Sequence, residues 1–240
     1  MADLEKGTTA NATGVNHSHN VYGDSTTPAL RNSITSPVKN NIANPAALGL
    51  FSFASTTLIL SLYNVSARGV THPNVVVGMA LFCGGLAQLL AGMWEFPKGN
   101  TFGATAFSSY GAFWLSYATI FIPGSGISEA YATDVEFINA VGIYLMTWMT
   151  VTFLLFIASL RKNIGFITLF GFLTLTFMCL GASNFVLSRG LATTGAHLGK
   201  AGGALGIITA LVAYYIGLSE LLAAERAAVV GLPIGVFKHD

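Results

Sequence analysis

Six apolar stretches, each long enough to cross a lipid bilayer, dominate this chain of 240 residues. The hydrocarbon layer of a bilayer is about 30 Å thick, and a helix that rises about 1.5 Å per residue needs about 20 apolar residues to cross it. The stretches that reach this length are residues 45–65, 75–96, 102–122, 135–160, 164–187 and 199–222. The sequence therefore predicts an all-α membrane protein with six transmembrane helices.

The composition excludes most soluble classes of protein. Hydrophobic residues make up 53% of the chain and charged residues 9%, whereas a soluble domain has about 25% charged residues. The net charge is +1, and the sequence has no cluster of Lys and Arg that could neutralise a run of phosphates, which argues against nucleic acid as a partner. This composition favours a lipid environment.

The chain is expected to divide into three segments. Residues 1–41 are rich in polar residues and have no apolar core, so they are typical of a disordered tail rather than of a signal peptide. Residues 42–225 hold the six predicted spans, and residues 226–240 are expected to form a short C-terminal tail.

Basic residues near the predicted spans indicate the orientation of the chain. With six spans both termini lie on one side of the membrane, and that side has more Lys and Arg than the other. The residues on the side of the termini are Arg31, Lys39, Lys98, Arg161, Lys162, Arg226 and Lys238, and those on the opposite side are Arg68, Arg189 and Lys200. Because cytoplasmic loops have this excess, both termini are expected to be cytoplasmic.

The reactive side chains do not suggest an enzyme. Cys83 and Cys179 fall inside apolar spans, where a thiol behaves as a small hydrophobe, and no Cys/His spacing indicates a metal site or a disulfide. The sequence offers no Ser/His/Asp set, no pair of acids spaced for acid–base catalysis and no phosphate-binding loop. We therefore expect neither catalysis nor a bound cofactor or metal.

Asn44 and Pro45 predict the start of the first helix. An amide side chain can accept a hydrogen bond from a free N–H group of the first turn, and the fixed φ of proline suits that turn. One interpretation gives Asn44 only this capping role. The other adds that a helix N-terminus at the membrane boundary attracts anions such as a carboxylate.

Polar residues inside the spans are the candidates for function, because a polar group is costly to place within the membrane. These residues are Thr57, Gln88, Glu95, Tyr110, Trp114, Asn184 and Glu220. Gln88 and Tyr110 lie deepest, where an unsatisfied polar group costs most, so a functional role is favoured for them. For Thr57 and Glu95 a purely structural role is the alternative. Thr57 can bond to the backbone of its own helix, and Glu95 can form an ion pair with Lys98.

The opening motif of the first span, Asn44-Pro45-Ala46-Ala47-Leu48-Gly49-Leu50, resembles the N-P-A-P-L-G-L signature of the acetate uptake transporters. This family includes a bacterial succinate–acetate permease and fungal acetate and ammonia-export proteins. Further matches are Gly84-Gly85-Leu86-Ala87-Gln88 and the run from Thr105 to Trp114, and the resemblance covers residues 42–235. A departure is Ala47, where the family usually has proline.

The resemblance implies a six-helix protomer, assembled as a hexamer, in which each protomer has its own path for acetate, other small monocarboxylates and, in some members, succinate. By motif position the apolar constriction of the family corresponds to Phe53, Tyr110 and Leu173. The polar residues of the family path correspond to Thr57, Gln88, Glu95 and Asn184. The long polar N-terminal segment is similar to that of fungal members, which implies a plasma-membrane location.

Two mechanisms remain open for such a path, because a bare carboxylate is unfavourable inside an apolar ring. In the first, a proton accompanies acetate, and Glu95 is the candidate shuttle, since a carboxyl group partly removed from water can exchange protons near neutral pH. In the second, Thr57, Gln88 and Tyr110 supply donors that replace water in a channel. Other functions that stay open are ammonia or ammonium export, a pore for small neutral solutes, and a membrane sensor.

Overall fold

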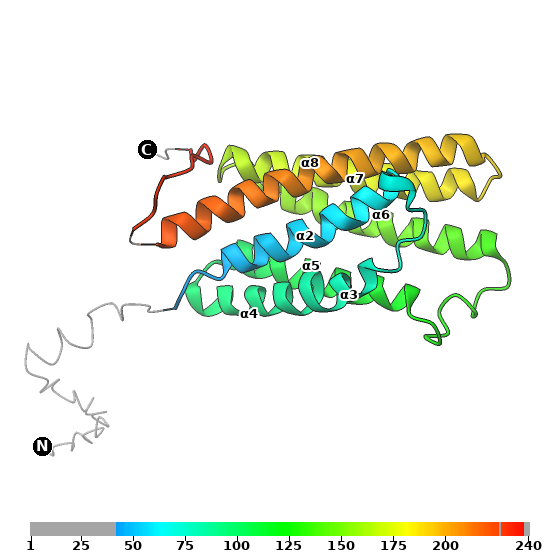
Figure 1. The fold of residues 1–240 in the computed structure, drawn as a ribbon, viewed down its shortest axis with the longest axis horizontal. Coiled ribbons are helices and arrows are strands. Elements are labelled where there is room, and N and C mark those ends of the chain that lie inside the picture. Colours follow the sequence, from blue (N-terminus) through cyan, green and yellow to red (C-terminus); the bar gives the residue numbers. More distant parts are fainter. Residues whose placement is uncertain (1–41, 226, 238–240) are drawn as a thin grey trace, which may run out of the picture. The chain divides into compact units, whose positions relative to one another are not determined.

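The computed structural model describes residues 42–225 and 227–237, and these residues form a bundle of long helices (Figure 1). The tail expected over residues 1–41 lies outside the described residues, as do Arg226 and residues 238–240. The long helices are α2 (Ala46–Asn64), α5 (Thr101–Phe121), α6 (Asp134–Ser159), α7 (Ile164–Leu187) and α8 (Ala192–Ala224). A run of three consecutive shorter helices lies between α2 and α5: α3 (Val76–Leu81), the π-helical turn η2 (Phe82–Ala87) and α4 (Gln88–Lys98).

Five helical segments of the described residues are long and apolar enough to cross a membrane. They are α2, the run Val76–Lys98, α6, α7 and α8. Helix α5 corresponds to the span predicted over residues 102–122 and has 21 residues, but its Ser, Thr and Tyr side chains make it more polar, and it is not one of the five. The multi-pass arrangement is therefore confirmed.

Two features of the spans differ from the prediction. Helix α8 begins at Ala192 rather than at residue 199. The prediction began too late because the first turns of α8 contain Thr and His residues, which a hydropathy pattern assigns to a loop. The second span is not a continuous α-helix, since it contains the π-helical turn η2. A π-helical turn within an α-helix often lies at a functional site, and here Gln88 follows it directly.

Glycines allow close approaches between helices. A Cβ atom added at Gly203 in α8 would lie 2.8 Å from Cβ of Asn64 in α2, and one at Gly84 in η2 would lie 2.7 Å from the Thr56 hydroxyl oxygen. Both distances are too short for a side chain, so α2 approaches α8 and η2 through these glycines. Small residues allow this kind of packing between membrane helices.

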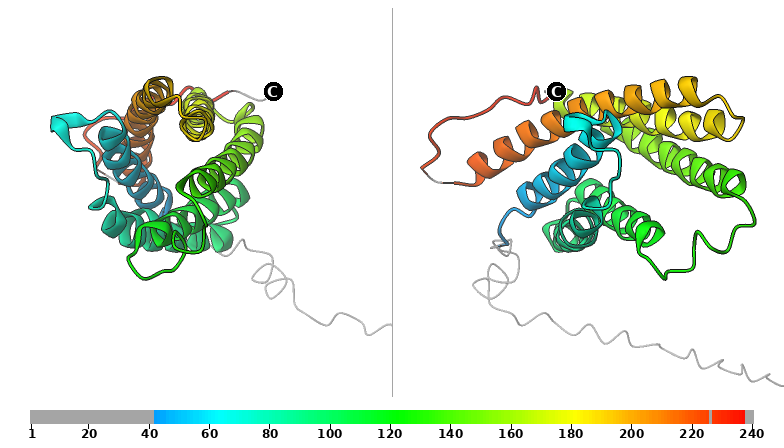
Figure 2. Two further views of the ribbon diagram at one scale, coloured as in Figure 1. Left: turned by 90° about the vertical axis from the view of Figure 1, so that its right-hand side faces the viewer. Right: turned by 45° about the vertical axis from the view of Figure 1, so that its right-hand side comes forward.

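Helices α5 and α6 contact each other mainly through side chains, whereas the other neighbouring helices pack closely by their backbones. Close backbone packing connects α2 with α8, α8 with α7, and α7 with α6, while α5 packs on α4, η2 and α3. The end-on view shows this order (Figure 2). Between α5 and α6 the contacts are made by long side chains, such as the hydrogen bond of 2.7 Å between Ser116 and Tyr144.

The segment before the C-terminus folds back on the helices, although the sequence indicated only a short tail there. The Ser219 hydroxyl group donates a hydrogen bond of 2.7 Å to the carbonyl oxygen of Leu232. The backbone N–H of Ile164 donates to the carbonyl oxygen of Gly235 at 3.0 Å, and Val236 forms an isolated antiparallel bridge with Asn163. Residues 232–236 are thereby fixed next to the turn between α6 and α7.

Candidate functional site

Two cavities follow one another inside the bundle, and Phe53 of α2 lines both. The first has a volume of about 340 Å³ and the second about 300 Å³. The first cavity reaches the end of the bundle at which α2 begins, and its lining includes Gln88, Tyr110 and residues of the C-terminal segment. The second lies on the other side of Phe53, with a lining that includes Thr57, Trp114 and Leu173.

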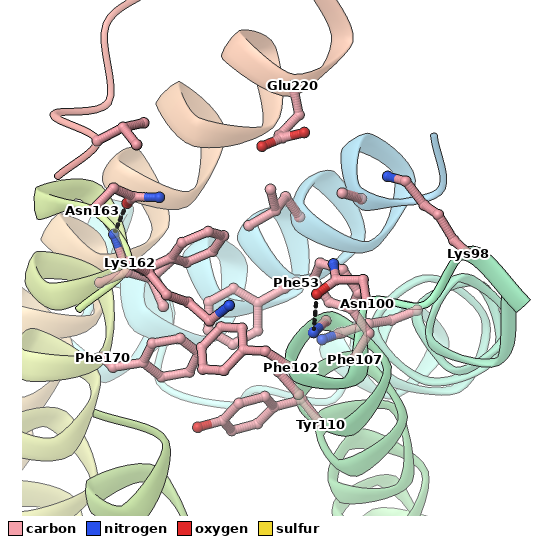
Figure 3. A pocket seen from close by; sticks show the side chains of 18 of the residues that line it. Phe53, Lys98, Asn100, Phe102, Phe107, Tyr110, Lys162, Asn163, Phe170 and Glu220 are labelled. Carbon is pink, nitrogen blue, oxygen red and sulfur yellow. Dashed lines mark hydrogen bonds between the residues drawn. The ribbon is translucent and has the colours of Figure 1, made fainter. Parts of the chain in front are cut away.

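Basic side chains lie around the first cavity. Lys98, Arg161 and Lys162 all line it, together with one acid, Glu220. Figure 3 shows Lys98, Lys162 and Glu220 around the aromatic rings that form the deeper part of this cavity. The ammonium group of Lys162 also lies 4.6 Å from the centre of the Phe102 ring, a cation–π contact. From the sequence, Lys98 was expected to mark the orientation and to offer Glu95 an ion pair, and Arg161 and Lys162 only to mark the orientation.

Asn44 connects three elements beside the first cavity. Its side-chain oxygen accepts a hydrogen bond of 3.1 Å from the N–H of Ala46, so the predicted capping role is confirmed. The same oxygen accepts a bond of 2.6 Å from the ammonium group of Lys98, and its amide nitrogen donates to a carboxylate oxygen of Glu220 at 2.9 Å. Asn44 does not line either cavity, and its amide group already has partners on α4 and α8.

Glu95 lies beside the first cavity without lining it. Its side chain is fully buried, with an exposed fraction of 0%. One carboxylate oxygen accepts a hydrogen bond of 2.9 Å from Asn100 and lies 4.0 Å from the Lys98 ammonium group. The other oxygen has no partner among the described residues. Asn100 does line the cavity, so one side chain connects Glu95 with it.

The three residues expected at the constriction lie where the two cavities meet. The ring centres of Phe53 and Tyr110 are 5.5 Å apart. Tyr110 lines the first cavity, Leu173 lines the second, and Phe53 lines both. All three side chains are buried. The structure therefore brings together residues from α2, α5 and α7 that the family resemblance placed in one ring.

Besides Glu95, three of the predicted polar residues have buried atoms without a hydrogen-bond partner in the described part of the chain. These atoms are both side-chain polar atoms of Gln88, the hydroxyl oxygen of Thr57 and the indole nitrogen of Trp114. Gln88 lines the first cavity, and Thr57 and Trp114 line the second. Thr56 differs from its neighbour, because its hydroxyl group donates to the carbonyl oxygen of Ser52 in the same helix at 3.0 Å.

Asn184 lines the second cavity as well, and its amide nitrogen donates to the carbonyl oxygen of Leu180 at 2.9 Å. Other residues of the site were not predicted from the sequence, above all Thr152, which bonds to the hydroxyl group of Tyr110 at 2.8 Å. Val236 and Phe237, which line the first cavity, were not predicted either. Nothing in the hydropathy pattern indicates these contacts, because they join helices and segments far apart in the sequence.

Comparison with known proteins gives consistent matches over most of the chain. Residues 26–235 match the model of the GPR1/FUN34/yaaH family. The chain is 38% identical over 221 residues to acetate permease A of Emericella nidulans, covering 90% of this chain and 72% of that protein. It is 36% identical over 195 residues to the succinate-acetate/proton symporter SatP of Escherichia coli, covering 81% of this chain and 96% of that protein.

Two further similarities bear on the range of functions. The chain is 40% identical over 220 residues to ammonia transport outward protein 2 of Saccharomyces cerevisiae, covering 91% of this chain and 74% of that protein. Among solved structures, that of the bacterial acetate channel SatP matches with a TM-score of 0.61 and 33% identity, covering 81% of this chain and 99% of that chain.

Proposed function

Because the chain belongs to the GPR1/FUN34/YaaH family, we propose that it carries acetate and other small monocarboxylates, with succinate as a further candidate, across a membrane. The path runs through the first cavity, past Phe53, Tyr110 and Leu173, and through the second cavity. One observation carries this proposal: buried polar atoms without partners line the two cavities on either side of Phe53. The names of the relatives support acetate as the substrate.

The polar atoms without partners suit a carboxylate. The indole N–H of Trp114 is a donor only, while the amide group of Gln88 and the hydroxyl group of Thr57 can also donate. A buried donor that lacks a partner costs about 1–3 kcal/mol. A carboxylate that accepts hydrogen bonds from Gln88 in the first cavity, and from Thr57 and Trp114 in the second, relieves part of that cost in each position. Asn184 is proposed as a further polar contact in the second cavity.

The charges around the first cavity favour an anion. Three basic residues and one acid line it, so the local potential is positive and raises the concentration of carboxylates near the opening. The N-terminus of α2, beside Asn44, adds the positive end of a helix dipole. This set of charges is the second argument for a carboxylate substrate.

The narrow ring of Phe53, Tyr110 and Leu173 raises the question of how the charge of acetate is handled. Moving a bare carboxylate past three apolar side chains costs several kcal/mol. We propose that a proton accompanies the substrate and that the Glu95 carboxyl group, beside the first cavity, takes up and releases this proton, while Asn100 holds the carboxyl group in place by its hydrogen bond. The alternative is channel-like permeation in which the donors on both sides of the ring replace water.

Ammonia or ammonium export is the second candidate function, and one observation favours it: a relative 40% identical to this chain has that name. An apolar ring suits neutral ammonia, but the basic side chains around the first cavity repel ammonium. A pore for other small neutral solutes suits the same ring. A membrane sensor has no feature of the described residues in its favour.

We also propose a plasma-membrane location, cytoplasmic termini and a hexameric assembly. Apolar side chains along the run Val76–Lys98 point outward, and Phe82, Leu86, Leu90 and Trp94 are each exposed by 45% or more. Such a face suits contact with lipid or with another protomer.

The proposed orientation can be tested with single cysteines. A cysteine placed at Ser128 should react with an impermeant thiol reagent in intact cells, and one placed at Ser25 should not. The opposite pattern would reverse the proposed orientation.

Labelled acetate uptake into liposomes that contain the purified protein tests the function. We expect uptake that depends on the protein and that unlabelled acetate and butyrate reduce by competition. The same liposomes are tested with labelled methylammonium, a stand-in for ammonium. Transport of methylammonium without transport of acetate would replace the first proposal with the second. Absence of both fluxes would leave only the neutral-solute pore and the sensor.

A further inference from the structure

The hydroxyl group of Tyr110 points away from the basic side chains at the end of the first cavity. Its oxygen lies 2.8 Å from the hydroxyl oxygen of Thr152 in α6. The Thr152 oxygen in turn lies 2.7 Å from the carbonyl oxygen of Trp148, one turn earlier in the same helix. Figure 3 shows the Tyr110 hydroxyl group across the cavity from Lys98 and Glu220.

The direction of these two hydrogen bonds follows from the chemistry of the groups. A carbonyl oxygen can only accept, and a threonine hydroxyl group has one proton. Thr152 therefore donates to Trp148 and accepts from Tyr110. The single hydroxyl proton of Tyr110 is then used, so Tyr110 presents its ring to the path and offers no donor to a substrate. This differs from the channel-like hypothesis of the sequence analysis, in which Tyr110 was one of the donors.

The bond from Tyr110 to Thr152 crosses between two helices that have little direct backbone packing. The close backbone neighbours of α5 are α2, α3, η2 and α4, and that of α6 is α7. Three aromatic rings pack against Tyr110 at ordinary contact distances: the ring centre of Phe53 lies at 5.5 Å, that of Trp148 at 6.1 Å and that of Phe170 at 6.3 Å. The hydrogen bond is the directional contact that fixes how far the Tyr110 ring extends toward Phe53.

We propose that Thr152 is a positioning residue that sets the size limit of the transport path through Tyr110. Thr152 is fully buried and lines neither cavity, so it acts without touching the substrate. When the bond is absent, the Tyr110 ring turns away from Phe53 more often, and longer acids pass. This inference rests on the proposed function, since it concerns which carboxylates the same path admits.

Substitutions at both ends of the hydrogen bond test the proposal. Thr152→Val keeps the shape of the side chain and removes the acceptor, Thr152→Ser keeps the hydroxyl group, and Tyr110→Phe removes the donor. The matched control is Thr150→Val, because Thr150 has the same kind of bond to its own helix, with 3.1 Å to the carbonyl oxygen of Met146, and its side chain is exposed. The measurement is the ratio of butyrate to acetate uptake in liposomes, for equal amounts of assembled protein.

We expect Thr152→Val and Tyr110→Phe each to raise this ratio by about two- to tenfold, the range that corresponds to losing one hydrogen bond. The double variant should raise it no further, since both changes remove the same bond. Thr152→Ser and Thr150→Val should keep the ratio of the unchanged protein. A Thr152→Val variant that transports acetate at the unchanged ratio, or additive effects in the double variant, would overturn the inference while leaving the proposed function intact. Absence of carboxylate flux in the unchanged protein would overturn both.

Discussion

The ring of Phe53 lies against the ring of Tyr110 with 5.5 Å between their centres, and Phe53 is the residue that lines both cavities. Phe53 is on α2 and Tyr110 on α5, so their contact depends on how these helices pack. A solute that passes from one cavity to the other along this route must pass these rings. The contact between these two residues is therefore central to the transport account.

Size selection by the third member of the ring gives the first prediction. Leu173→Ala shortens a buried side chain that lines the second cavity. We expect the rates for butyrate and succinate to rise relative to acetate, because the ring widens with little change in its polarity. The measurement is the relative uptake of the three acids into liposomes.

The matched control for this prediction is Leu155→Ala. Leu155 is similarly buried but lines neither cavity, so its truncation should cost about 2–5 kcal/mol of stability, as at Leu173, without changing selectivity. If the relative rates of the three acids are unchanged in Leu173→Ala, or change equally in both variants, Leu173 does not belong to the path.

The hydrogen bonds of Asn44 give a prediction about stability. Asn44→Asp keeps the oxygen that accepts from Lys98 and Ala46, but it places a carboxylate against Glu220, 2.9 Å from the position of the present amide nitrogen. We expect a lower unfolding temperature in detergent, because the like charges repel and a donor is lost.

A second substitution provides the control for Asn44→Asp. Glu220→Gln in the Asn44→Asp background restores a donor and acceptor pair, since the glutamine amide can donate to the new carboxylate. The double variant should recover most of the lost stability. An Asn44→Asp variant as stable as the unchanged protein would show that the contact between Asn44 and Glu220 contributes little.

Proton coupling through Glu95 is the third prediction. Glu95→Gln keeps an oxygen that accepts from Asn100 but removes the group that can exchange a proton. We expect accumulation of acetate driven by a pH gradient to fall, while exchange of labelled for unlabelled acetate without a gradient continues. Glu136→Gln is the control, since Glu136 is an exposed acid at the start of α6.

Assembly of the Glu95→Gln variant must be measured first, because a change at a buried charged group can cost a few kcal/mol of stability. Full gradient-driven accumulation in a well-assembled variant would reject the proton role of Glu95 and favour channel-like permeation. A parallel loss of accumulation and exchange would instead assign Glu95 a structural role beside Asn100 and Lys98.

The positions of the helices could be predicted from the sequence because membrane spans are defined by local composition. The predicted range 164–187 coincides with α7, and the Asn44 cap was recognisable from one dipeptide. The proximity of Phe53 and Tyr110 was predicted through the family motifs. Their hydropathy alone gave no such information, since Phe53 and Tyr110 lie on different helices with the run Val76–Lys98 between them in the sequence.

Contacts between distant segments could not be predicted in the same way. The bond from Tyr110 to Thr152 requires the relative rotation of α5 and α6, which no period in the sequence specifies. The π-helical turn before Gln88 inserts a change of register that a pattern of apolar residues does not reveal. The pairing of Val236 with Asn163 was missed because short extended segments have no hydropathy signal of their own.

Acetate flux in Gln88→Leu tests the transport path most directly, since Gln88 lines the first cavity with both polar atoms unpaired. Leucine fills a similar volume, so we expect uptake into liposomes to fall by about tenfold or more, in line with losing one or two hydrogen bonds to a charged group. The unfolding temperature should stay the same or rise, because a buried polar group without a partner is removed. The control is Thr209→Val, a buried hydroxyl group that bonds within α8 and lines neither cavity, and it should keep full uptake. Undiminished acetate uptake by a well-assembled Gln88→Leu protein would contradict the account.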